Sequence, residues 1–90
     1  MNSMKRQTID SVPIDIKQEL ARYGSLAARP RELIYRILAN DLHGAAMSAD
    51  SDGIGHLLYA ITVFVYHELP ISIYGSQAKV DSWLAKGVPT

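Results

Sequence analysis

Apolar residues recur at helical spacing in four segments of the sequence, and glycine or proline stands between the segments. Within each segment most apolar positions repeat every three or four residues, which places them on one face of a helix. The pattern predicts four helices, over residues 13–23, 30–49, 54–69 and 76–86. Four helices with short connections are typical of a compact four-helix bundle or an orthogonal helical array, so the sequence predicts an all-α fold.

Proline and glycine mark the expected ends of these helices. Pro30 suits the first turn of the second helix, where a missing N–H is not needed. Gly24 is expected to end the first helix in a left-handed conformation. Pro70 is expected to end the third, because the residue before a proline avoids helical geometry. Residues 1–10 lack periodicity and are expected to form a flexible arm, which leaves residues 11–90 as a single helical domain.

The third segment, residues 54–69, is apolar on nearly every side. Its β-branched residues would suit a strand, but its length is ordinary for a helix and long for a strand. A helix that is apolar all round is either the central helix of its domain or part of an oligomer interface. The segment therefore also predicts self-association as a C2 homodimer.

The apolar stripes of the four segments also predict a hydrophobic core. Its expected members are Ile16, Leu20, Leu33, Ile37, Leu38, Leu42, Leu58, Ile61, Phe64, Val65, Val80 and Leu84. Truncation of Phe64 to alanine is expected to cost about 3–5 kcal/mol, because lost burial and a cavity term add.

Length and composition narrow the class of protein. The chain has 90 residues, 48% apolar and 20% charged, as in one ordinary globular domain. Nine lysines and arginines balance nine aspartates and glutamates, which argues against a polybasic nucleic-acid coat and a polyacidic DNA mimic. The chain has no cysteine, which excludes disulfides and thiolate metal sites. With no secretory signal and no apolar run long enough for a membrane span, a cytoplasmic protein without membrane contact is expected.

The sequence contains no recognisable catalytic, cofactor or metal motif. No two of its three histidines have the four-residue spacing of paired helical ligands. The acidic segment 48–59 resembles a calcium loop only in its centre, because Ser48 stands at the first ligand position and Tyr59 at the twelfth. Neither a glycine-rich phosphate loop nor a G-x-S-x-G nucleophile motif occurs. We therefore expect no enzyme activity, no cofactor and no resident metal.

Charge is distributed unevenly along the chain. Residues 22–36 hold four arginines against one glutamate, whereas residues 37–68 hold four acidic residues and no lysine or arginine. A planar guanidinium can grip a carboxylate or a phosphate at two points. The sequence therefore predicts a partner-binding arginine cluster. Its members are Arg22, Arg29, Arg31 and Arg36.

A simpler interpretation of the same charges remains open. The arginines could pair inside the domain, with carboxylates such as those of Asp41 or Asp50. The functional surface would then lie in the acidic stretch or on Tyr59, Tyr66 and Tyr74.

These features predict a small non-enzymatic protein–protein interaction module that regulates or inhibits a larger protein complex by occupying its surface. A bacterial or phage accessory protein fits this description. Inhibitors of host defence complexes, such as anti-CRISPR proteins, share the size class, although no motif supports that analogy. The alternative is a small nucleic-acid-binding regulator that uses the arginine cluster. DNA affinity that falls steeply with salt would favour the alternative, because phosphate contacts release counterions.

Overall fold

The structure, a computed structural model, describes residues 9–86, which contain five labelled α-helices, two short 3₁₀ turns and no strand. In chain order the elements are α2 (Ile14–Leu26), α3 (Glu32–Leu38), α4 (Leu42–Asp52), η1 (Gly55–Leu57), α5 (Leu58–Glu68), η2 (Ile71–Ile73) and α6 (Gln77–Lys86). The predicted all-α fold is confirmed. The flexible arm predicted over residues 1–10 lies outside the described residues, except for Ile9 and Asp10, which are helical.

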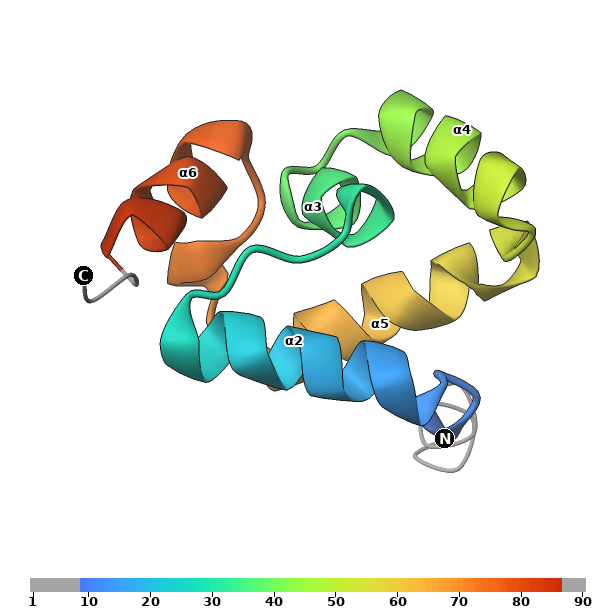
Figure 1. The fold of residues 1–90 in the computed structure, drawn as a ribbon, viewed down its shortest axis with the longest axis horizontal. Coiled ribbons are helices and arrows are strands. Elements are labelled where there is room, and N and C mark those ends of the chain that lie inside the picture. The colour runs from blue at the N-terminus through green and yellow to red at the C-terminus, as the bar shows by residue number, and fades with distance from the viewer. Residues whose placement is uncertain (1–8, 87–90) are drawn as a thin grey trace.

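The helices surround a small core without forming a parallel bundle. In Figure 1, α2 and α5 lie across the lower part of the view, α4 lies at the upper right and α6 at the left. Between them stands α3, seen nearly end-on, which contacts both α4 and α6. Of the two arrangements that the sequence predicted, this crossing of helices corresponds to the orthogonal array.

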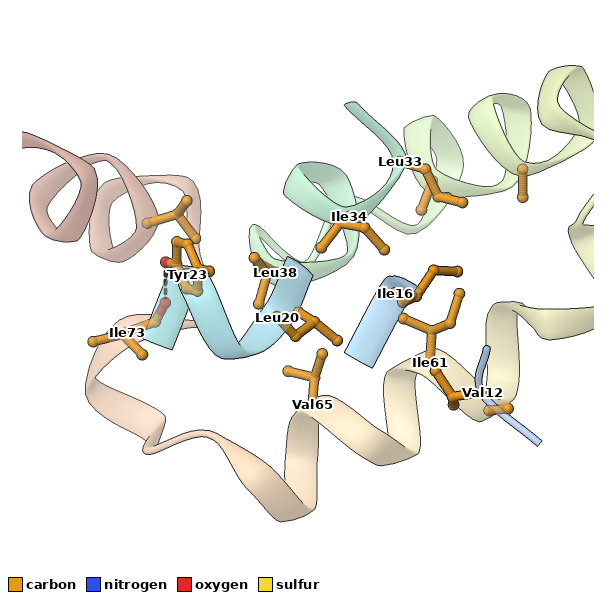
Figure 2. Close-up of a cluster of buried hydrophobic side chains, with 14 residues drawn as sticks. Val12, Ile16, Leu20, Tyr23, Leu33, Ile34, Leu38, Ile61, Val65 and Ile73 are labelled. Carbon is orange, nitrogen blue, oxygen red and sulfur yellow. Dashed lines mark hydrogen bonds between the residues drawn. The ribbon is translucent and has the colours of Figure 1, made fainter. Parts of the chain in front are cut away.

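The core forms where α2, α3 and α5 meet. Figure 2 shows Ile16 and Leu20 of α2 directed toward Ile61 and Val65 of α5, with Leu38 of α3 nearby. Seven predicted core residues are buried, and four others are partly buried against the core. The buried seven are Ile16, Leu20, Leu33, Leu38, Ile61, Val65 and Val80. The partly buried four are Ile37, Leu58, Phe64 and Leu84.

The single helix predicted over residues 30–49 is wrong, because the chain breaks it into α3 and α4. Asn40 adopts a left-handed conformation, with φ of 63°, which asparagine tolerates better than most residues. Asp41 then caps α4 by accepting a hydrogen bond from the N–H of Gly44 over 3.0 Å. The prediction that Leu42 belongs to the core is also wrong. After the break, Leu42 is the first residue of α4, and its side chain is 74% exposed.

The expected helix end at Gly24 is also wrong. Helix α2 continues to Leu26, and Ala27 closes it in the left-handed conformation with φ of 51°. Gly24 instead allows α2 to approach the chain after α5, because a Cβ at this position would lie 3.0 Å from the Leu69 side chain. The predicted end before Pro70 is confirmed, since Leu69 is extended and α5 stops at Glu68.

Tyr23 joins three elements at the end of the core beside α6. Its side chain is fully buried, and its hydroxyl donates to the backbone carbonyl of Ile73 in η2 over 2.5 Å. Its own backbone carbonyl accepts a hydrogen bond from Nε1 of Trp83 in α6 over 2.6 Å. Burial, with a smaller contribution from the negative charge of Asp81, raises the pKa of Tyr23 to about 12.

This pKa predicts a loss of stability at alkaline pH. The unfolded chain releases the Tyr23 proton near pH 10, whereas the folded protein holds it to about pH 12. The stabilising contribution is therefore complete below pH 10 and is lost as pH rises from about 10 to 12. Urea unfolding followed by circular dichroism at a series of pH values measures this fall. The Tyr23→Phe variant should lose less stability over this pH range, because it has no hydroxyl at this position to ionise. An equal loss in the variant would show that Tyr23 is not the responsible group.

Candidate protein interface

The predicted arginine cluster does not form one free surface, because two of its members pair with carboxylates of the same chain. The backbone N–H and Nε of Arg31 both donate to the carboxylate of Glu19, over 2.5 and 2.8 Å. Nη2 of Arg31 lies 3.4 Å from the carboxylate of Asp15. Both carboxylates stand on α2, so Arg31 fastens the start of α3 to that helix. These contacts raise the pKa of Arg31 in spite of partial burial.

Arg36 is held in the same way at the end of α3. Its Nε lies 2.7 Å from the carboxylate of Glu32, one turn earlier, and its Nη1 lies 2.8 Å from that of Asp41. The Gly44 N–H, followed by the Arg36 guanidinium, lowers the pKa of the Asp41 carboxyl. The side chains of Arg36 and Asp41 close over Gly44, where a Cβ would displace one or both of them.

The other two arginines are more accessible. The guanidinium of Arg29 lies 4.6 Å from the ring centroid of Tyr35, a cation–π contact, and Tyr35 in turn donates its hydroxyl to Asp81 over 2.6 Å. Arg22 is exposed, and within residues 9–86 neither Arg22 nor Arg29 forms an ion pair. Internal pairing therefore accounts for Arg31 and Arg36 but not for the whole cluster.

A second surface lies on the outer side of α5, and we call its residues Tyr59, Thr62 and Tyr66 the α5 face. The tyrosines are 72% and 69% exposed, and Thr62 between them is also exposed. Residues seven apart differ by only about 20° around a helix, so both rings project from one side. The hydroxyl of Thr62 donates to the carbonyl of Leu58 over 2.8 Å. The opposite side of α5 carries Ile61 into the core.

The α5 face carries no charge. Residues 58–66 contain no acidic or basic side chain, and the next residue, His67, packs edge-on against Tyr66 with ring centroids 5.3 Å apart. Tyrosine is enriched at protein interfaces, where charged residues are depleted. An exposed aromatic stripe without charge is thus typical of a surface that another protein covers.

The remaining large exposed apolar residues do not form comparable stripes. Leu42 and Met47 are 74% and 61% exposed on α4, but a spacing of five turns them about 140° apart around that helix. Ile14 and Leu26 are exposed at opposite ends of α2, and Ile71 is exposed on η2. Scattered apolar residues of this kind are normal on a protein surface and indicate no site.

Residues 9–86 contain no group of three or more histidine, aspartate or glutamate side chains placed to hold a metal ion. None of the described helices is long and apolar enough to cross a membrane.

Comparison with known proteins leaves the site to be interpreted from its own geometry. No protein-family model, no curated protein and no solved structure matches the chain. Sequence reasoning singled out Tyr59 and Tyr66 only as an alternative to the arginines. Their seven-residue spacing in an uncharged segment was the available signal, but the sequence did not show which side of the helix is covered.

Proposed function

We propose that this protein is a small non-enzymatic protein–protein interaction module, which regulates or inhibits a larger complex and uses the α5 face as its contact surface. The observation that carries the proposal is the pair of tyrosines, both about 70% exposed on one uncharged side of a helix. Tyrosine is among the residues that contribute most to binding energy at interfaces. The matching partner surface is an apolar groove with polar atoms at its edge for the two hydroxyls.

Nucleic-acid binding has less support from the described residues. Arg31 and Arg36 already contact the carboxylates of Glu19 and Asp41. The negative charge of these carboxylates would repel phosphate groups. Arg22 and Arg29 alone offer few phosphate contacts. DNA affinity with a steep salt dependence would overturn this ranking.

Self-association through the α5 face is part of the proposal. An uncharged face can meet its own copy across a two-fold axis without repulsion. At about 150 Å² for each of the four tyrosines, the rings of such a dimer bury about 600 Å². A stable interface needs about 1,000 Å², so the dimer is expected to be weak and to form only at high protein concentration.

Removing both rings tests the proposal. The double variant Tyr59→Gln/Tyr66→Gln keeps good helix formers on α5 and is expected to be monomeric in sedimentation equilibrium at concentrations where the native protein associates. The matched control Leu42→Gln/Met47→Gln removes two apolar side chains of similar exposure from α4 and should associate like the native protein. Equal association of both variants would exclude the α5 face as the dimer contact.

Binding to a larger complex is measured with a purified partner. A protein retained on the immobilised chain from an extract of the native host is purified and titrated against each variant. We expect at least about tenfold weaker binding by the tyrosine variant and unchanged binding by the control, because tyrosine is enriched among the interface residues whose truncation costs more than about 1 kcal/mol. A partner that binds both variants equally would contradict the proposed contact surface.

A further inference from the structure

A groove between η2 and α6 differs in chemistry from the α5 face. Its volume is about 340 Å³, near the lower end of the range for small-molecule sites. Residues that line it include Ser72, Ile73, Lys79, Ser82, Trp83 and Lys86. The lining thus combines an apolar wall with two ammonium groups and two hydroxyls, and it contains no carboxylate.

The apolar wall of the groove is held in a fixed orientation. Nε1 of Trp83 donates to the carbonyl of Tyr23 over 2.6 Å, which ties the indole to the end of α2. Ile73 beside it is 6% exposed and belongs to the core cluster. A planar or apolar ligand would therefore meet a wall that is already ordered, with little entropy to lose on binding.

The two lysines stand on the same side of α6. Lys79 and Lys86 are seven residues apart, and Ser82 lies between them on that side. The ammonium group of Lys79 donates to the carbonyl of Ile71 over 3.2 Å, which holds it at the rim with donors to spare. Within residues 9–86 neither lysine forms an ion pair.

Asp81, the acidic residue of α6, does not neutralise the side of the helix that carries Lys79 and Lys86. The carboxylate of Asp81 accepts a hydrogen bond from the hydroxyl of Tyr35 in α3 over 2.6 Å. Asp81 does not line the groove. The charged side chains that line the groove are therefore all positive, a composition that suits an anion.

We propose that this groove binds a small phosphorylated molecule with a planar body. The phosphate would lie over the Ser82 hydroxyl, within reach of the flexible stems of Lys79 and Lys86, while the planar body would lie against Trp83. Lysine binds phosphate as a point charge, and hydroxyl groups complete its hydrogen bonds. This site uses none of the residues of the α5 face, so it stands or falls independently of the proposed function.

Trp83 makes the proposal directly measurable, because it is the only tryptophan in the chain. The probe is adenosine monophosphate, titrated into the native protein while tryptophan emission is recorded. We expect a saturable change of emission, with an affinity that falls as salt is added. Adenosine without phosphate and inorganic phosphate are titrated separately, and each should bind at least about tenfold more weakly than the nucleotide.

Lysine variants locate the site. Lys79→Gln/Lys86→Gln should weaken nucleotide binding at least about tenfold, because both cationic donors are lost. Lys17→Gln is the control. The Lys17 ammonium group belongs to α2 and lies over the ring of Phe64, outside the groove, so this variant should bind the nucleotide like the native protein. The absence of a saturable change, or equal binding by the double variant, would overturn the proposal. Inorganic phosphate binding as tightly as the nucleotide would overturn the role given to Trp83.

Discussion

Replacing Leu20 by alanine is expected to lower the free energy of unfolding by about 2–5 kcal/mol. Leu20 is completely buried, and Figure 2 shows it among side chains of α3 and α5, including Leu38 and Val65. The truncation removes apolar burial and leaves a cavity that these packed helices cannot close. A domain of this size has about 5–15 kcal/mol of stability in total, so the variant should be close to unfolding.

The control for this change is the same substitution at an exposed leucine. Leu42→Ala should alter the free energy of unfolding by no more than about 0.5 kcal/mol, because Leu42 is 74% exposed at the start of α4. Urea unfolding followed by circular dichroism measures both variants. Similar losses at the two positions would contradict a core centred on α2.

The degree of burial also changes the stability loss that we expect for Phe64→Ala. The sequence-based value of about 3–5 kcal/mol for Phe64→Ala applies to a fully buried ring. Phe64 is only partly buried, at the edge of the core, and Lys17 lies over its ring with 5.9 Å between Nζ and the centroid. We therefore expect a smaller loss for Phe64→Ala than for Leu20→Ala.

Replacing Tyr23 by phenylalanine is expected to cost about 1–3 kcal/mol, although it deletes a single oxygen atom. The Tyr23 hydroxyl donates to the carbonyl of Ile73 in a buried setting. Without the hydroxyl, that carbonyl stays buried and loses its donor, which is more costly than losing an exposed hydrogen bond. The contact also connects α2 to η2, so its loss should weaken the attachment of α6.

Tyr59→Phe provides the matched control, because it removes the same hydroxyl from a side chain that is 72% exposed. Its free energy of unfolding should equal that of the native protein in the same urea experiment. Hydrogen exchange should become faster in η2 and α6 of Tyr23→Phe but not of Tyr59→Phe. A Tyr23→Phe variant as stable as the native protein would show that water or a rearranged donor replaces the hydroxyl.

The sequence alone determined the fold class and nearly half of the core, since it predicted seven of the 15 apolar residues that are buried within residues 9–86. Periodicity is a local property, and the apolar repeats that contain Ile16, Leu20 and Ile61 predict helices whatever their neighbours are. The stop before Pro70 is equally local, because it follows from the geometry of proline. These predictions agree with the structure.

Two helix boundaries were predicted wrongly from the sequence, one because of local side-chain contacts and one because of a tertiary contact. At the break, Asn40 is left-handed, and Asp41 both caps α4 and pairs with Arg36 of α3. Gly24 looked like a helix stop, yet its lack of a side chain makes room for Leu69. Leu69 is brought beside Gly24 only by the folded chain, whereas the two partners of Asp41 lie within five residues of it.

For the two candidate surfaces too, the sequence located the segment, and the folded structure decided which side chains are available. Counting charges located an arginine-rich segment, but the pairing of Arg31 with Glu19 requires the chain to fold back from α3 onto α2, which a charge count does not show. The sequence showed that the segment around Tyr59 and Tyr66 is apolar all round. Only the packing of the other helices against one side of α5 decided which residues are buried and which remain exposed, because burial belongs to the assembled helices and not to any one of them.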